Sequence, residues 1–279
     1  DALEFAHAAH DSGSDKGWSG RVLGMIYRDL GELETAQHHF DDAYVFERAQ
    51  EPVVETRVAE LSDHRVILAA HQGDMEAARD ALSESDRLRR GYLGEDWDGM
   101  VWHRHWTGLL AIATGDGKSA AGLLDRMLTD YVRFIGETSH LLAFARSDRG
   151  WTALIQGDIE YARELFSLAR TRLESMQEGP HPRLAEVLLG QSLIALTDGE
   201  QGIARQLSER ALMIRRVALS DSPGAKTWRA NACRVHRWAG GECTEALEAY
   251  PNGLDRARVN HAVRALCFSW SQGCPIREN

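Results

Sequence analysis

Glycine recurs in this sequence at a fixed interval of 42 residues, and this interval restricts the possible folds more than any other feature. The repeated glycines are Gly31, Gly73, Gly115, Gly157, Gly199 and Gly241. An alanine follows each of them five residues later, at Ala36, Ala78, Ala120, Ala162, Ala204 and Ala246. Because the chain has only 25 glycines in 279 residues, six in one phase are not expected by chance. The sequence therefore predicts a tandem array of similar structural units.

Each unit has the apolar pattern of two helices joined at the glycine. In the first unit, Val22, Leu23 and Ile26 are spaced as on one face of a helix. After the glycine, Ala36 and Phe40 begin a second stripe of helical spacing. Glycine suits the turn because it adopts a positive φ without the steric cost of a Cβ, and the acidic residue that follows it in most units suits a helix start. The sequence predicts an all-α fold built from helix–turn–helix units.

The first unit resembles the tetratricopeptide (TPR) repeat. The matching positions are Leu23, Gly24 and Tyr27 in the first helix, and Ala36, Phe40 and Ala43 in the second. The 42-residue length and joints such as Ser222-Pro223 are similar to the long variety found in kinesin light chains and in bacterial sensor, kinase and scaffold chains. The resemblance implies an α-solenoid, a right-handed superhelix in which the first helix of each unit lines the concave face.

The repeat phase divides the chain into three parts. Residues 1–10 correspond to the end of a second helix, so we interpret them as the remnant of a preceding repeat. Residues 11–253 form six TPR-like repeats, and the turn sequence at 250–253 stops the last one short. Residues 254–279 are expected to be a capping helix and a loose tail. We expect the natural protein to be longer, with an effector domain as the candidate neighbour in the same chain.

Aromatic and polar residues concentrate at the first-helix positions that face the groove in the TPR family. The resemblance implies a ligand-binding concave groove at Trp18, Arg21, Arg28, Trp102, His105, Phe144, Trp151, Trp228, Asn231 and Trp238. Aromatic and arginine side chains are typical of binding hot spots. The alternative is that the tryptophans only fill space between adjacent first helices.

Two known recognition modes of the family are absent from these positions. The chaperone-binding clamp needs paired Lys and Asn, whereas the equivalent positions here hold residues such as Arg21 and Met25. Kinesin light chains repeat an asparagine at a position where this chain has only Asn231. The partners of those relatives are therefore not transferred to this protein.

Charge and hydropathy exclude two kinds of partner. The net charge is −10, and the sequence pI is about 5.6. Arginines gather near the ends of second helices, where we expect solvated cations that complement the helix dipole: Arg87, Arg89, Arg90, Arg170, Arg172, Arg215 and Arg216. An acidic solenoid without a basic stripe is a poor nucleic-acid binder, and no apolar run is long enough to span a membrane. We expect no nucleic-acid or membrane partner and a cytoplasmic protein.

Signals for catalysis, metals or cofactors are weak. All four cysteines lie near the C-terminus, at Cys233, Cys243, Cys267 and Cys274. Their spacing matches no zinc motif, so free thiols, a disulfide and a metal site all remain open. Gly117-Lys118-Ser119 resembles the end of a phosphate-binding loop, but Ile112 replaces the required glycine. We expect no catalytic residue, no metal and no cofactor.

Three functions are compatible with these observations. The first is a non-catalytic protein- or peptide-binding TPR module of a larger regulatory or scaffolding protein, with its ligand in the concave groove. The alternative is a small-molecule effector-sensing domain of a bacterial regulator, which a closed pocket near Trp151 and His105 would favour. An enzyme that uses the C-terminal Cys and His residues is the third hypothesis.

Overall fold

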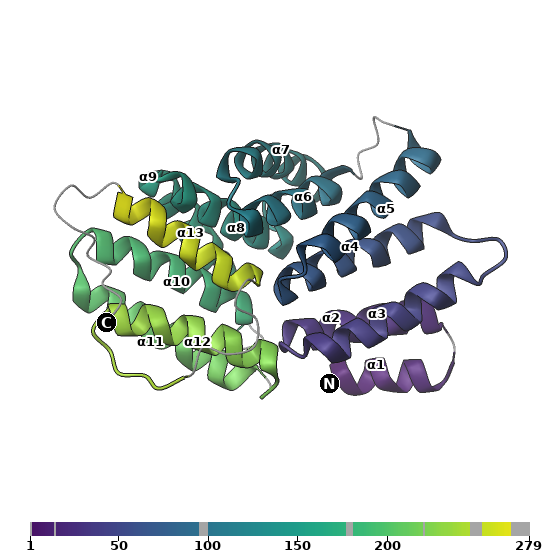
Figure 1. Ribbon diagram of the computed structural model, residues 1–279, viewed down its shortest axis with the longest axis horizontal. Coiled ribbons are helices and arrows are strands. Elements are labelled where there is room, and N and C mark those ends of the chain that lie inside the picture. The colour runs from purple at the N-terminus through teal and green to yellow at the C-terminus, as the bar shows by residue number, and fades with distance from the viewer. Residues whose placement is uncertain are drawn as a thin grey trace.

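The computed structural model confirms the all-α prediction. It describes residues 2–13, 15–94, 100–176, 181–219, 221–245 and 253–268. Within these ranges the chain forms thirteen helices and no strand, and Figure 1 shows them stacked side by side in a curved array. No helix in the described ranges has the length and apolar character that crossing a bilayer would need.

The helices follow the predicted pairs, with one helix before the first pair and one after the last unit. The single helices are α1 (Ala2–Asp11) and α13 (Leu254–Phe268). The first helices of the units are α2 (Lys16–Asp29), α4 (Glu55–Gln72), α6 (Met100–Thr114), α8 (His140–Gln156), α10 (Pro182–Thr197) and α12 (Pro223–Trp238). The second helices are α3 (Leu33–Arg48), α5 (Met75–Leu93), α7 (Gly117–Ile135), α9 (Ile159–Glu174) and α11 (Gln201–Ala218).

Five of the six repeated glycines make the turn as predicted. Gly31, Gly73, Gly115, Gly157 and Gly199 all have φ between 78° and 83°. Aspartates then cap the following helices: Asp74 accepts a hydrogen bond from the backbone N–H of Ala77 at 3.0 Å, and Asp116 and Asp158 repeat the arrangement.

The sixth turn differs from the prediction. Gly240 has the positive φ, of 78°, whereas Gly241 does not. The reason is that α12 ends at Trp238, one residue earlier in the repeat than α10 does, so the left-handed residue also comes one position earlier. Gly241 is still needed, because a Cβ there would overlap the ring of His236.

Small residues allow the two helices of each pair to approach closely. The repeated alanines Ala36, Ala78, Ala120, Ala162 and Ala204 have no exposed surface. Gly24 packs on Phe40, where a Cβ would lie only 2.5 Å from the ring, and Gly150 packs on Phe166 in the same way. These contacts explain why the repeated alanines and the helical glycines Gly24 and Gly150 are small: a larger side chain at these positions would take the space that the neighbouring large side chains fill.

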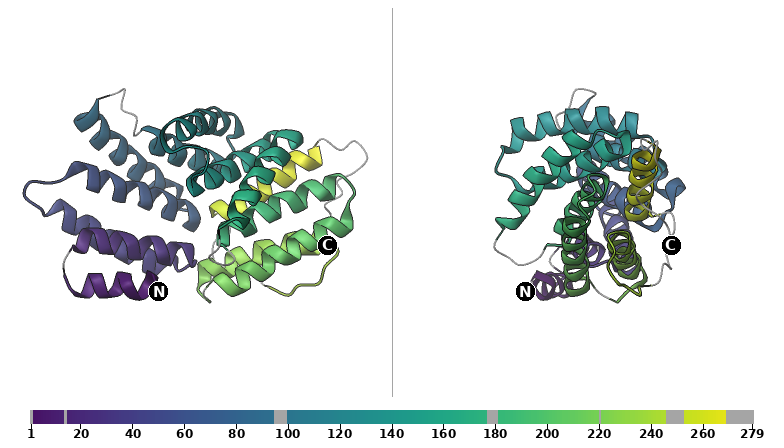
Figure 2. Two further views of the ribbon diagram at one scale, coloured as in Figure 1. Left: turned by 180° about the vertical axis from the view of Figure 1, so that it is seen from behind. Right: turned by 90° about the vertical axis from the view of Figure 1, so that its left-hand side faces the viewer.

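The array curves until its first and last units touch. The hydroxyl of Ser222, just before α12, donates a hydrogen bond to the carbonyl of Gly31 at 2.5 Å, across 191 residues of sequence. A Cβ on Gly31 would lie 2.7 Å from the backbone nitrogen of Ala225, so the two segments are in close contact. The left view of Figure 2 shows the end of the α2–α3 pair next to the beginning of α12. The concave side is therefore enclosed rather than open along its length.

The C-terminal helix α13 lies on the inner side of this curve. Its principal neighbours are α8 and α6, with smaller contacts to α12 and α4, and Figure 1 shows it beside α8 and α10. Val259, Ala262 and Leu266 join the large apolar cluster of α8 to α12, whereas Leu254 joins the cluster of α4 to α8. The expected end cap is thus also a helix packed inside the array.

The residues before α13 carry no helix where the structure describes them. Residues 241–245 are irregular, and the rest of the expected second helix of the sixth unit, with the turn at 250–252, lies outside the described residues. The expected tail also lies outside them from residue 269 onward.

Two arginines at second-helix ends correct the expectation of solvated cations. Arg89 and Arg215 are 5% and 2% exposed. Arg89 donates to Asp63 at 2.5 Å, and Arg215 donates to Asp255 of α13 at 2.7 Å. They are buried because their helix ends turn toward the inner side, where a carboxylate compensates each guanidinium. Arg87, Arg90 and Arg216 are exposed, as expected.

Candidate functional site

A pocket of about 730 Å³ lies on the inner side of the array. All six first helices contribute to its wall, and α5 and α7 each add one residue. We call it the central pocket and define it by these lining residues: Arg21, Val22, Met25, Arg28, Asp29, Glu60, Asp63, His64, Ile67, His71, Arg89, Trp102, His105, Trp106, Tyr131, His140, Leu141, Phe144, His181, Pro182, Arg183, Glu186 and Trp228. Its volume falls in the range of pockets that hold small molecules.

The structure separates the candidate site residues into two groups. Six of them line the central pocket: Arg21, Arg28, Trp102, His105, Phe144 and Trp228. The other four do not: Trp18, Trp151, Asn231 and Trp238. The position of a residue in the repeat therefore predicts that it lies on the inner side, but it does not predict whether the side chain is accessible there.

Three of the four residues outside the pocket are part of the packed interior. Trp151 is 2% exposed and meets Phe166 edge-on at a centroid distance of 5.8 Å. Asn231 is fully buried and donates to the carboxylate of Asp255 at 2.7 Å. Trp238 packs against the same apolar cluster, with the Arg234 guanidinium 4.9 Å from its ring centroid. For these tryptophans the space-filling interpretation describes the structure; Trp18 is 41% exposed.

Four rings from α6 and α7 form an aromatic cluster in the wall of the pocket. The ring centroids of His105 and Trp106 are 4.7 Å apart and nearly parallel. Trp102 meets Tyr131 edge-on at 5.3 Å and stacks on Trp106 at 6.1 Å. Offset and edge-to-face contacts of this kind fix ring positions. The aromatic cluster is therefore a preformed surface, with Trp102 as its most accessible ring.

Polar atoms of this aromatic cluster have no hydrogen-bond partner among the described residues. They are Nδ1 of His105, Nε1 of Trp106 and the hydroxyl of Tyr131. The Nε2 atom of His105 lies 2.8 Å from Oδ2 of Asp148. Because a carboxylate only accepts hydrogen bonds, Nε2 carries the proton, and a neutral ring then offers Nδ1 as an acceptor. Buried polar atoms without a partner are uncommon in folded proteins and call for an explanation.

The charged side chains of the pocket wall are paired with one another. Arg21 pairs with Glu60, Arg28 with Asp29, Arg89 with Asp63, and Arg183 with Glu186. These pairs include every arginine and every carboxylate of the lining. The wall therefore contains many charges but offers no uncompensated one.

Burial keeps three titratable groups of the wall, His64, His71 and Tyr131, in their uncharged forms at neutral pH. Burial, and then the positive charge of Arg258, lowers the pKa of His71 to about 3. Burial, followed by the charges of Arg28 and Arg21, also lowers the pKa of His64 well below its usual value. Burial and the negative charge of Asp148 raise the pKa of Tyr131. At neutral pH these groups present uncharged donors and acceptors to the pocket.

A buried ionic network behind the pocket holds α13 in place. Arg258 of α13 donates to Asp148 and, at 2.7 Å, to Glu186. Arg183 contacts the same two carboxylates. Burial alone would raise the pKa of Asp148, but the charges of Arg258 and Arg183 and the hydrogen bond with His105 outweigh it and hold the pKa far below its usual value. The network links the aromatic cluster to α13 through His105.

Sequence reasoning missed several of these residues. Tyr131, which contributes to the aromatic cluster, lies 42 residues after Arg89 and 84 before Arg215, and all three are buried at second-helix ends. Their common position in the repeat is the pattern that could have identified them from the sequence. Asp148, Arg183 and Arg258 gave no comparable signal, because their contacts depend on where α13 packs.

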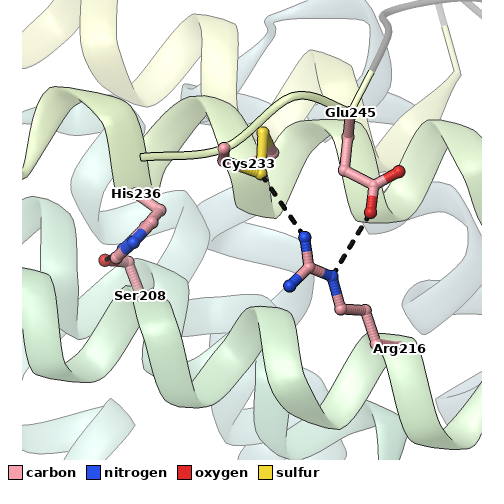
Figure 3. The surroundings of a disulfide bond; sticks show 6 residues. Ser208, Arg216, Cys233, His236 and Glu245 are labelled. Atoms are coloured by element: carbon pink, nitrogen blue, oxygen red, sulfur yellow. Dashed lines mark hydrogen bonds and ion pairs between the residues drawn. A yellow bond between two sulfur atoms is a disulfide. The ribbon is translucent and has the colours of Figure 1, made fainter. Parts of the chain in front are cut away.

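Two of the four C-terminal cysteines, Cys233 and Cys243, form a disulfide, whereas Cys274 lies outside the described residues. Cys233 of α12 is bonded to Cys243, with their Cα atoms 5.5 Å apart. Figure 3 shows the bond beside Arg216, which also pairs with Glu245 at 3.3 Å. Cys267 is disulfide-bonded too. No group of three His, Cys, Asp or Glu side chains suited to a metal ion occurs in the described ranges.

Comparison with known proteins supports the fold and leaves the ligand open. No family model matches the chain, and no curated protein matches it either. The crystal structure of BtubC (BKLC) from P. vanneervenii is similar, with a TM-score of 0.53 and 16% sequence identity; the match covers 77% of this chain and 87% of that one. At this identity the similarity concerns the fold alone. The protein is an all-α solenoid with a TPR-like helical-repeat fold.

Proposed function

We propose that this protein is a non-catalytic effector-binding module, in which the TPR-like array holds a small molecule in the central pocket. The observation that carries the proposal is the enclosure of the concave side. The contact between Ser222 and Gly31 closes the array, and α13 covers part of the inner surface. What remains is a compact pocket of about 730 Å³, which suits a small molecule better than a long extended peptide.

The proposed role is regulatory. A ligand that contacts several first helices at once stabilises one curvature of the array, because each helix pair packs mainly on its neighbours. Such a module reports ligand binding to whatever domain or protein is attached to it. Resemblance to bacterial sensor and kinase chains with long TPR-like repeats supports this role.

A variant that fills the pocket tests the proposal independently of ligand chemistry. Met25 lines the pocket on α2, so Met25→Trp places a large ring inside it. Leu168→Trp is the matched control, since Leu168 is 41% exposed on α9 and lies outside the pocket. A metabolite library is screened by thermal shift, and each ligand found is measured again by calorimetry on both variants.

We expect ligands to raise the melting temperature of the wild type and of Leu168→Trp but to bind Met25→Trp at least tenfold more weakly. Ligands that bind both variants equally well would place the binding site elsewhere and contradict the proposal.

A second candidate is the binding of a helical segment of another protein. It is favoured by α13, because this helix shows that the inner side of the array accepts a helix, with apolar residues such as Val259 and an anchoring arginine, Arg258. A peptide array on the wild type and on Met25→Trp distinguishes the two. Peptide binding that is lost in Met25→Trp, with no small-molecule binding, would favour this candidate.

A further inference from the structure

The chemistry of the central pocket indicates what kind of ligand it accepts, provided that the proposed function holds. We propose that the ligand is an uncharged, ring-containing molecule that carries both hydrogen-bond donors and acceptors. Three features of the pocket wall support this ligand class: its charges, its unpaired polar atoms and its rings.

The charges of the wall leave no counter-charge for an ionic ligand. Each lining arginine already contacts a carboxylate, as in the pair of Arg89 with Asp63 at 2.5 Å and the pair of Arg183 with Glu186 at 2.9 Å. A carboxylate or phosphate ligand would have to displace an acid from its arginine, and an ammonium ligand would have to displace an arginine. At the buried pair of Arg89 with Asp63, either exchange leaves a charge in the protein interior without its partner, which is costly. An uncharged ligand avoids this cost.

The unpaired atoms require a ligand with polar groups. His105 and Tyr131 are 4% and 2% exposed, and their Nδ1 and hydroxyl atoms lack a partner in the described part of the chain. Trp106 adds an unpaired N–H next to them. The wall thus contains two donors and one acceptor in one place, so the complementary ligand carries acceptors and a donor. Each unpaired buried group has a cost that a new hydrogen bond would relieve.

The rings of the wall favour a flat ligand, and one of them covers the polar atoms. Trp102 contacts His105, Trp106 and Tyr131 and is the more exposed ring of the four. Because the three unpaired polar atoms have almost no exposed surface, the proposal requires the Trp102 side chain to turn so that a ligand can reach them. Phe144 and Trp228 line the pocket on α8 and α12 and offer further faces for stacking. A ligand ring held between such faces would bring its polar groups to the aromatic cluster.

A matched series of probes tests the charge class on the full chain. The probes are 2-naphthamide, 2-naphthoate and 2-naphthylmethylamine, which share one ring system and are neutral, anionic and cationic at pH 7. Dissociation constants are measured by calorimetry or by ligand-observed NMR. We expect the amide to bind at least tenfold more tightly than either charged probe. Equal or tighter binding of naphthoate or of the amine would overturn the inference.

Two variants connect the result to the aromatic cluster. Tyr131→Phe keeps the ring and removes the hydroxyl, so we expect it to weaken binding of the amide about fivefold to tenfold. Because the hydroxyl has no partner among the described residues, the same variant is expected to melt at the same or a higher temperature than the wild type. Tyr161→Phe, outside the pocket, is the control and should leave amide binding unchanged. An unchanged affinity in Tyr131→Phe contradicts the assignment of the polar contacts.

Met25→Trp separates this inference from the proposed function. If a charged probe binds most tightly and Met25→Trp abolishes its binding, the pocket remains the ligand site and only the proposed ligand class is wrong. Probe binding that Met25→Trp does not change would contradict both, as would no binding of any probe up to its solubility limit.

Discussion

The first three units and the last three units of this array use the same repeat positions for different purposes. At one position of the first helix, Arg21, Asp63 and His105 line the central pocket. The same position in the later units holds Ser147, Leu189 and Asn231, each with no exposed surface. At this repeat position, the side chains of the first three units line the central pocket, whereas those of the last three units belong to the packed interior.

The position of α13 explains this difference. The helix lies mainly on α8 and α6, and its apolar residues Val259, Ala262 and Leu266 join the cluster that contains Leu189 and Trp151. Only its first residue, Leu254, reaches the cluster of α4 to α8. The position of a residue in the repeat thus determines whether its side chain faces the inner side. Whether that side chain is then accessible or buried depends on where α13 packs.

Replacing equivalent residues of the two halves by alanine gives the most direct test. Met25 and Trp151 occupy the same repeat position, but Met25 lines the pocket and Trp151 is buried against Phe166. We expect Trp151→Ala to lower the free energy of unfolding by about 4 kcal/mol, because it leaves a large cavity. Met25→Ala should cost less than about 1 kcal/mol, because the pocket already exists there. Urea denaturation of both variants measures the difference, and equal losses would contradict the division.

The network that anchors α13 should be the next most sensitive site. Asp148→Asn removes the charge that Arg258 and Arg183 share, and we expect a loss of about 3 kcal/mol. This loss of stability is near the lower end of the range for breaking a buried ion pair, because Glu186 still pairs with both Arg258 and Arg183. Asp125→Asn is the control. Its carboxylate pairs with Arg149 but is half exposed, so its loss should be about 1 kcal/mol or less.

The disulfide is a stabilising feature of the last unit alone. Cys233 and Cys243 close a short loop, with a sequence separation of 10 residues. We expect Cys243→Ser to lower the free energy of unfolding by about 2 to 3 kcal/mol. Cys243 is the position to change because Cys233 is fully buried in the apolar cluster, where a serine hydroxyl would add a cost of its own. A thiol count on the unfolded, unreduced protein provides the check, since reactive thiols at both positions would contradict the bond.

Acid should act on the pocket half through its histidines. The folded pKa of His71 is about 3, below the unfolded value of about 6.5, so the unfolded chain binds more protons between these values. Stability is therefore fully present above pH 6.5 and is lost as the pH falls below it. Between pH 7 and 5 this group contributes a loss of about 1 to 2 kcal/mol. The variant His71→Gln should show a smaller loss over the same range in urea denaturation, and an equal one would argue against a neutral, buried His71.

Most of the fold was predictable because its determinants are local. The 42-residue interval of glycine and alanine, read with helical spacing, located five of the six turns and distinguished first helices from second ones. Glycine is required where φ is positive, and alanine is required where two helices touch. Both residues therefore recur at fixed positions in the sequence. The sixth turn was displaced by one residue, because α12 ends early.

The candidate site was only partly predictable, since burial depends on contacts between distant segments. The repeat phase brought Trp102 and His105 to the pocket, but the same reasoning also selected Trp151 and Asn231, which α8, α12 and α13 bury. Tyr131 was missed because only the first helices were expected to line the concave face. Whether any of these residues binds a ligand stays a prediction for the experiments above.

By itself, the sequence determined that the chain is a solenoid of helix pairs, where each pair turns, and which helices face inward. Those properties follow from side-chain size and backbone freedom within a single unit. Only the tertiary structure decided that the array closes on itself between Gly31 and Ser222 and that α13 packs on the inner side against α8 and α6. The closure and the ionic contacts of Arg258 join residues far apart in the chain, and no local pattern specifies such pairs.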